Sequence, residues 1–274
     1  STRIMAMVRM ANTIAMGNYD VQMPNKGRDE LDQLASSLNH MAEVLSESIR
    51  LLQRKNEELD QFAHIVSHDL KAPLRGIDNV VTWIEEDHNT ELPPKIREYI
   101  HLIKGRLLRA ENMIKGILLY ARVGKQSLER EFINLNALLN DILENLALRP
   151  GLKVITQPYM PEIYSERIPL QQVLSNLISN AIKYHDKPDG YIKVSVTSHS
   201  DHWQFSVEDN GPGISKNYHE KIFVIFQTLQ ERDSFESTGV GLAIVKKILD
   251  DRKQNITLES SPGKGTIFRF TWPK

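Results

Sequence analysis

The chain has 274 residues, of which 41% are hydrophobic, and its formal net charge is −1. That length accommodates one large domain or several small ones, and a balanced charge without a basic block gives no electrostatic reason to expect a nucleic-acid partner. The absence of cysteine excludes disulfides, thiolate metal sites and a cysteine nucleophile. No apolar run approaches the roughly 20 residues of a membrane-spanning helix. A start at Ser1, directly in patterned sequence, indicates a fragment of a longer protein.

The N-terminal part is predicted to be helical. Residues 3–16 carry apolar side chains at helical spacing, and Gly17 ends that helix. An extended connector is expected over 18–27. No glycine or proline then occurs before Pro73, and acidic residues open this segment, as a helix start prefers.

The long helix carries apolar residues at alternating spacings of three and four, which is the pattern of a coiled-coil seam. Its two heptad positions hold Leu31, Leu38, Leu45, Leu52, Leu59 and Val66, and Leu34, Met41 and Phe62. Ser48 and Lys55 weaken the second position, which indicates a register adjustment. Because such a seam needs a partner helix, we expect a parallel homodimer. One long amphipathic helix packed within a monomer is the alternative.

A second helix is expected over 94–122, so that two chains would form a four-helix bundle. After Gly124 the pattern changes to mixed helix and strand. Helices are predicted at 135–148, 170–184 and 240–250, and strands at 153–157, 191–199 and 202–209, before a terminal hairpin. The expected fold is a multidomain chain in which an all-α coiled coil and bundle precede an α/β sandwich.

The stretch HIVSHDLKAPLRG places His68 beside Asp69 on the long helix. His68 is two residues from both Val66 and Leu70 of the apolar seam, about 200° around the helix from each, so it is expected to point away from the core. Pro73 is expected to bend the helix one turn later. Taken alone, an exposed histidine beside a bend is most simply a surface residue.

The run from His68 to Pro73 resembles the phospho-acceptor box of dimeric sensor histidine kinases, where a histidine, an acid, a basic residue and a proline recur at this spacing. A neutral imidazole is a nitrogen nucleophile near neutral pH. Asp69 can accept a hydrogen bond from Nδ1–H, which fixes the tautomer and leaves Nε2 free to attack. The resemblance implies catalytic roles for His68, Asp69 and Lys71.

The helix over 170–184 carries a polar ridge across its apolar stripe. Two asparagines four residues apart, followed by a lysine and a tyrosine, resemble the N box of the same family, and they are Asn176, Asn180, Lys183 and Tyr184. Mg²⁺ prefers oxygen ligands, so the amide oxygen of Asn180 can hold it without adding charge against a triphosphate. The resemblance implies that Lys183 meets phosphate oxygens.

Two glycine-rich stretches resemble the family's glycine boxes. In DNGPGI, Asp209 ends a strand with its carboxylate free to accept from an adenine amino group, and Gly211 and Gly213 let the backbone approach the base. In STGVGLAIVKK, amides at a helix start can cradle phosphates, which implies nucleotide contacts from Gly239, Val240, Gly241 and Leu242. FVIFQTL, between the two glycine boxes, resembles the F box. GTIF resembles the strand in which a threonine lies behind the adenine pocket in the family, which implies a nucleotide contact from Thr266.

These boxes occur in the family's order and imply a Bergerat-type ATP-binding domain that uses ATP and Mg²⁺. The N-terminal part resembles a HAMP linker. The expected domains are a signalling linker over 1–53, a dimerisation and phosphotransfer hairpin over 54–126, and a catalytic domain over 127–274. The resemblance implies autophosphorylation of His68 and transfer to an aspartate of a response regulator. It also implies a homodimer that reaches a membrane only through segments outside this chain, as the cytoplasmic portion of a membrane sensor.

Three positions depart from the family pattern. Ala72 stands four residues after the histidine, where many relatives have the Thr or Asn thought to orient a hydrolytic water, so weak or absent phosphatase activity is expected. Thr228 replaces an arginine of the F box, which leaves the γ-phosphate contact to Arg232 or Lys183. Ser237 replaces a glycine, which would stiffen the lid.

Two other functional classes remain open. Gyrase-like and chaperone-like ATPases share the nucleotide fold but need a glutamate general base on the helix that carries Asn180, and residues 170–184 contain no acidic residue. The second alternative is a catalytically silent dimeric scaffold that relays conformation or binds a regulator.

Overall fold

The computed structural model describes residues 2–24, 29–88, 92–123, 129–227 and 238–274. The chain forms two compact units, Ser1–Phe62 and Ala63–Lys274. The helices within the described residues include none whose length and hydrophobicity would suit a bilayer. The described elements, in chain order, are α1 (Thr2–Ala15), α2 (Glu30–His88), α3 (Pro94–Arg122), β1 (Glu131–Asn134), α4 (Leu135–Glu144), β2 (Lys153–Thr156), β3 (Glu162–Ser165), α5 (Arg167–Lys183), β4 (Tyr191–Ser198), β5 (His202–Asp209), η1 (Lys216–Tyr218), η2 (Lys221–Phe223), α6 (Gly241–Asp251), β6 (Ile256–Ser260) and β7 (Thr266–Pro273).

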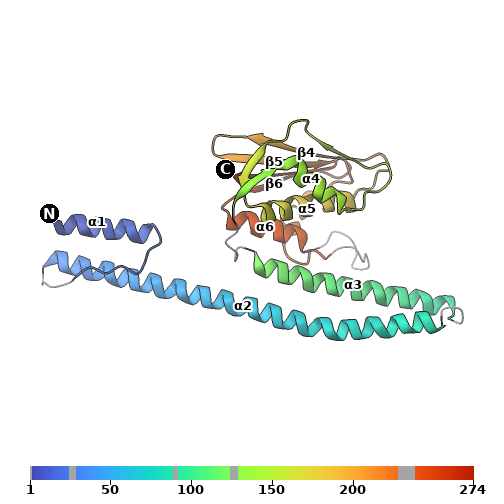
Figure 1. Ribbon diagram of the computed structural model, residues 1–274, viewed down its shortest axis with the longest axis horizontal. Coiled ribbons are helices and arrows are strands. Elements are labelled where there is room, and N and C mark those ends of the chain that lie inside the picture. The colour runs from blue at the N-terminus through green and yellow to red at the C-terminus, as the bar shows by residue number, and fades with distance from the viewer. Residues whose placement is uncertain (1, 25–28, 89–91, 124–128, 228–237) are drawn as a thin grey trace. The chain divides into compact units, whose positions relative to one another are not determined.

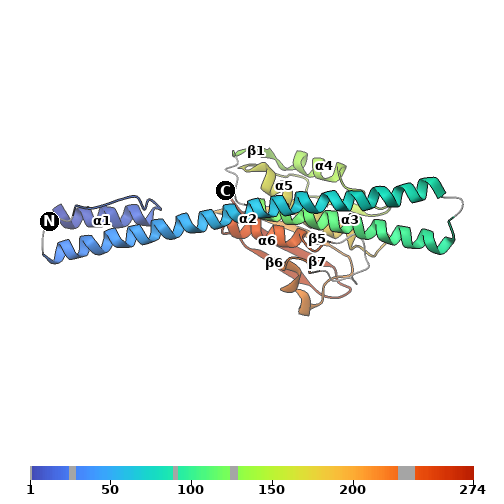
Figure 2. The ribbon, with the colours of Figure 1, turned by 90° about the horizontal axis from the view of Figure 1, so that it is seen from below.

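In the first unit, α1 lies beside the start of α2 (Figures 1 and 2). Met10 and Ile14 of α1 pack against Ala42 of α2, and all three side chains are buried. The connector is held by the amide of Asn39, which accepts from the Met23 N–H at 2.8 Å and donates to the Met23 carbonyl at 2.9 Å. The side-chain amide of Asn39 thus satisfies both the N–H and the carbonyl of Met23. These backbone groups stay paired although the extended connector lies beside a helix and not in a sheet.

In the second unit, α3 runs beside the C-terminal part of α2 (Figure 2). The buried side chains between them include Ala63, Ser67 and Val81 of α2 and Ile100, Leu107 and Ile114 of α3. Several residues of the predicted seam are exposed instead, among them Phe62 at 64% and Leu70 at 47%. The helix also continues through Pro73 to its end at His88. The single chain therefore buries a neighbouring stripe of α2 and leaves part of the predicted heptad stripe uncovered.

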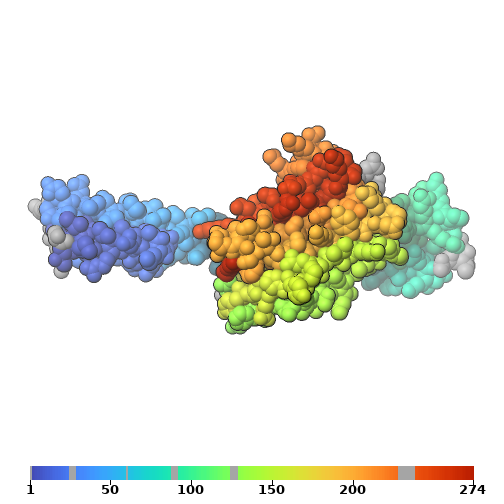
Figure 3. Space-filling view, turned by 90° about the horizontal axis from the view of Figure 1, so that it is seen from above, coloured from blue at the N-terminus to red at the C-terminus, as the bar shows by residue number. Residues whose placement is uncertain are grey.

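The α/β lobe confirms the predicted sandwich. Its five-stranded sheet has the order β2-β4-β5-β7-β6, parallel only between β2 and β4. Helices α5 and α6 lie against one face, where α5 contacts β4 and β5 and α6 contacts β7 (Figure 1). Alternating residues of the strands, such as Phe205 and Phe270, whose rings stack at 5.0 Å, point into this core. The opposite face of the sheet is mostly polar and carries the Arg269–Glu259 ion pair. Figure 3 views the lobe from the side of this face.

Two short strands, β1 and β3, were not expected from the sequence. They pair antiparallel as a separate two-stranded sheet, with Ile133 opposite Ile163, and both isoleucines are buried. Each strand has only four residues, and β1 buries a single side chain, so neither produces the run of alternation by which strands are recognised.

Candidate active site

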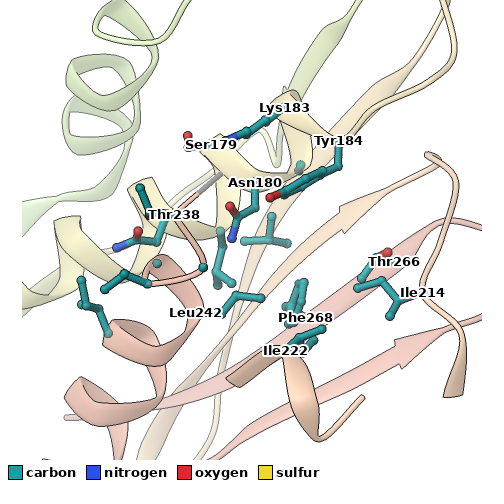
Figure 4. Close-up of a pocket in the computed structure, with 18 of the residues that line it drawn as sticks. Ser179, Asn180, Lys183, Tyr184, Ile214, Ile222, Thr238, Leu242, Thr266 and Phe268 are labelled. Atoms are coloured by element: carbon teal, nitrogen blue, oxygen red, sulfur yellow. The ribbon is translucent and has the colours of Figure 1, made fainter. Parts of the chain in front are cut away.

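A pocket of about 460 Å³ opens between α5, the ends of β5 and β7, and the loop before α6 (Figure 4). Eleven of the twelve residues expected to contact nucleotide line it: Asn176, Asn180, Lys183, Tyr184, Asp209, Gly213, Gly239, Val240, Gly241, Leu242 and Thr266. Four separate segments of the sequence therefore converge on one cavity. Its size suits a nucleotide-sized ligand.

One wall of the pocket is the polar ridge of α5. Asn180 and Tyr184 lie on it above the cavity in Figure 4. Asn176 donates through Nδ2 to the carbonyl of Gln172 at 2.8 Å. Its Oδ1 faces the start of α6 so closely that a Cβ on Gly241 would lie 2.7 Å from it. The side chain of Asn176 therefore lies close to the start of α6, where a residue larger than glycine at 241 would clash with it.

Asp209 ends β5, and the sheet register places it opposite Thr266 of β7. Its Oδ1 accepts the N–H of Gly211 at 2.8 Å. Burial raises the pKa of the Asp209 carboxyl, while the hydrogen bonds from the Gly211 and Thr266 amides act in the opposite direction. Gly211 is absent from the residues that line the pocket, and its N–H orients the Asp209 carboxylate. Its predicted contact with the base stays a prediction.

The start of α6 forms the far end of the pocket. Gly239 has a φ of +67°, a backbone conformation that favours glycine. The N-cap residue Val240 makes no side-chain cap hydrogen bond, so the first amides of α6 have no such partner. Unsatisfied amides at a helix N-terminus suit an anion such as phosphate.

The predicted phospho-acceptor lies on α2. The His68 side chain is 79% exposed, and its Nδ1 is 3.2 Å from Oδ1 of Asp69. A carboxylate only accepts, so in the neutral ring Nδ1 carries the proton and Nε2 is a free nucleophile. Lys71 is half-buried, and Ala72 is exposed. Among the described residues that line the pocket, none comes from α2.

Three family models match consecutive parts of this chain. They are the HAMP domain at residues 2–47, the His Kinase A (phospho-acceptor) domain at 58–126, and the histidine kinase-, DNA gyrase B- and HSP90-like ATPase at 165–274. This chain belongs to the sensor histidine kinases. The phospho-acceptor match contains His68, and the ATPase match contains every pocket residue predicted from the sequence.

Curated relatives and a solved structure agree with this membership. The phytochrome-like protein Cph1 of Synechocystis is 37% identical over 85% of this chain and 31% of its own length. The sensor histidine kinase MtrB of Mycobacterium leprae is 30% identical over 97% of this chain and 48% of its own length. The structure of histidine kinase ThkA in complex with response regulator protein TrrA matches with a TM-score of 0.53 at 26% identity, over 81% of this chain and 65% of that one. The chain thus spans less than half of the length of each of these curated relatives.

Sequence reasoning missed the apolar half of the pocket. The residues concerned are Leu177, Ala181, Val207, Ile214, Ile222 and Phe268. Their helical and alternating spacing identified several of them as core, and the same spacing places them beside the polar site residues. Gly116 and Leu119 of α3 also line the cavity, and no local signal marks them. The expectations for Thr228, Arg232 and Ser237 concern residues that lie outside those the structure describes.

Proposed function

We propose that this chain is a protein-histidine kinase that phosphorylates itself on His68 with ATP and then transfers the phosphoryl group to an aspartate of a response regulator. The observation that carries the proposal is an exposed imidazole with a carboxylate at its Nδ1, in the same chain as a pocket built from the family's nucleotide residues. ThkA, a family member, was solved with a response regulator, which supports a partner of that class here.

The phosphoryl transfer follows from the His68 geometry. The Nε2 lone pair attacks the γ-phosphorus of ATP, the N–P bond forms, and the bond from that phosphorus to the β,γ-bridging oxygen breaks, leaving ADP. The hydrogen bond from Nδ1–H to Asp69 stabilises the positive charge that develops on the ring. The high exposure of His68 leaves room for the nucleotide first and for a regulator aspartate afterwards.

The pocket residues supply binding and orientation. Asp209 would accept the adenine amino group, and the apolar side chains would enclose the ring. The amides at the start of α6 and Lys183 would hold the phosphates. The neutral oxygen of Asn180 fits Mg²⁺, which takes few protein ligands beside substrate phosphates and would reduce the phosphate charge met by the nucleophile.

We also propose a homodimer. The stripe of α2 left uncovered by α3 includes Leu59, Phe62, Leu70, Ile77 and Ile84, all of which are exposed. A second copy of the hairpin would bury that stripe in a four-helix bundle. The modules proposed are 1–53, 54–126 and 127–274, and the HAMP match supports a place on the cytoplasmic side of a membrane sensor.

Incubation with ATP and Mg²⁺ separates the three functional classes. A kinase acquires an acid-labile, base-stable label on His68. An ATPase releases phosphate without becoming labelled, and a silent scaffold does neither. Release of phosphate without label would contradict the proposal.

Asp69 provides a test of the proton's position. In Asp69→Asn we expect ATP binding to be unchanged and labelling to be at least about tenfold slower. The neutral amide cannot stabilise the positive charge on the imidazole as the carboxylate does, and a tenfold loss corresponds to about 1.4 kcal/mol of barrier. Single-turnover labelling measures the rate, and calorimetry measures binding. Labelling at the wild-type rate would remove Asp69 from this role.

Ala72 predicts weak phosphatase activity. Its methyl group cannot orient a water molecule toward a regulator's phospho-aspartate. We expect little ADP-stimulated loss of phosphate from a phosphorylated regulator with the wild-type chain, and a gain of several-fold in Ala72→Thr, whose autophosphorylation should be preserved. Rapid loss with the wild-type chain would refute this expectation.

A further inference from the structure

His185 follows the last turn of α5, and its side chain is only 4% exposed. A Cβ on Gly190 would lie 2.0 Å from its Cε1, and a Cβ on Gly211 would lie 3.6 Å from its Cδ2. The ring therefore occupies a slot between the start of β4 and the loop after Asp209. The pocket's lining residues do not include it.

The hydrogen bonds of His185 assign its tautomer. The backbone N–H of Lys187 donates to Nδ1 at 3.2 Å, so Nδ1 carries no proton. Nε2 lies 3.0 Å from Oδ1 of Asn210, which only accepts, so Nε2–H is the donor. The same Oδ1 accepts the Tyr191 N–H at 2.8 Å, which fixes the orientation of the amide. The ring is thus a neutral imidazole with both nitrogens paired.

Asn210 is the neighbour of Asp209, so this network sets the backbone that presents the carboxylate. Lys187 Nζ donates to the Asn210 carbonyl at 2.6 Å. Arg149 binds the other side, donating to the carbonyls of His185 at 3.1 Å and Lys183 at 3.3 Å. Side chains outside the pocket lining therefore hold both the C-terminal end of α5 and the residue that follows β5.

We propose that His185 is a positioning residue for base recognition: its neutral ring ties the end of α5 to Asn210 and thereby sets the direction in which Asp209 faces the pocket. This inference rests on the proposed nucleotide site. His185 does not touch the nucleotide, so its effect should fall on affinity and on discrimination between bases. A carboxylate selects adenine, whose 6-amino group donates, over guanine, whose O6 accepts. Misplacing Asp209 should therefore weaken ATP more than GTP.

The test compares His185→Leu with His185→Gln in the full chain. His185→Leu removes both hydrogen bonds, and we expect the Kd for ATP by calorimetry to rise by about tenfold or more while the ATP-to-GTP preference falls. The side-chain amide nitrogen of glutamine can take the place of Nε2, so His185→Gln should stay within about threefold of wild type. In autophosphorylation, the KM for ATP should rise with little change in kcat.

Ser165→Ala is the matched control for a general loss of stability. It removes the buried hydrogen bond that Trp272 Nε1 donates to Ser165 Oγ at 2.7 Å, and neither residue lines the pocket. We expect it to lower the melting temperature without changing the ATP-to-GTP preference. If His185→Leu does not fold, His185→Asn replaces it, because asparagine keeps an acceptor for the Lys187 N–H but is too short to reach Asn210.

The outcomes distinguish this inference from the proposed function. A wild-type chain that binds no ATP would overturn the nucleotide site itself. A wild-type chain that binds ATP, beside a folded His185→Leu with the same Kd and preference, would overturn the role of His185 alone. Tighter ATP binding by His185→Asn than by His185→Gln would also overturn it.

Discussion

His68→Gln is expected to abolish phosphorylation of the chain while leaving ATP binding intact. Glutamine is similar in length to histidine and polar, so the exposed surface of α2 should tolerate it, but its amide nitrogen is not a nucleophile. Because the Nε2–P bond is the only new covalent bond to the protein in the proposed reaction, the loss of phosphorylation should be complete. Intact-protein mass after incubation with ATP and Mg²⁺ measures it.

His64 supplies the matched control. It lies one turn before His68 on the same exposed part of α2, and its Nδ1 is 3.5 Å from Nη2 of Arg122, with no carboxylate hydrogen bond recorded among the described residues. His64→Gln should be phosphorylated like the wild type. A phosphoryl group that persists in His68→Gln, or one that disappears in His64→Gln, would mean that the acceptor has been misidentified.

Asn180→Ala should abolish Mg²⁺-dependent nucleotide binding. The variant removes the one side-chain oxygen assigned to the ion and leaves a methyl group facing the triphosphate. Calorimetric titration of ATP, in Mg²⁺ and again in excess chelator, gives the result directly. We expect the wild type to bind much more tightly in Mg²⁺, and the variant to show the same weak binding in both conditions.

Two further variants sharpen this experiment. Asn180→Asp keeps an oxygen ligand and should retain part of the Mg²⁺ dependence. Asn145→Ala removes a similar amide whose Nδ2 donates to the Asp141 carbonyl at 2.7 Å, away from the pocket, and should bind like the wild type. An unchanged Mg²⁺ dependence in Asn180→Ala would assign the ion to other groups.

Local sequence was enough to predict most of the α/β lobe. Alternation in β4 and β5 and helical spacing in α5 are short-range patterns, because side chains repeat every two residues in a strand and about every 3.6 in a helix. Polar residues that interrupt those patterns at regular intervals, such as Asn176 and Asn180, stand out against them. For that reason eleven of the predicted nucleotide contacts line one pocket in the structure.

The helical hairpin shows where such patterns fail. The heptads of α2 indicated an apolar stripe, but a helix can carry two apolar stripes side by side. Within one chain α3 covers the stripe that includes Ala63, Ser67 and Val81, while Phe62 and Leu70 stay exposed. Which stripe faces which neighbour depends on contacts between residues far apart in sequence, and spacing along one helix does not encode them.

The amino-acid sequence by itself indicated the order of the elements, the proposed acceptor His68 with Asp69, and the polar residues of the pocket, because each depends on a few neighbouring residues. Only the tertiary structure decided that Gly211 orients Asp209, that the buried ring of His185 supports Asn210, and that Gly116 and Leu119 reach the cavity from α3. These are contacts across tens of residues. They depend on how sheet, helices and loops pack, and the close packing of a protein interior makes that arrangement a property of the whole lobe.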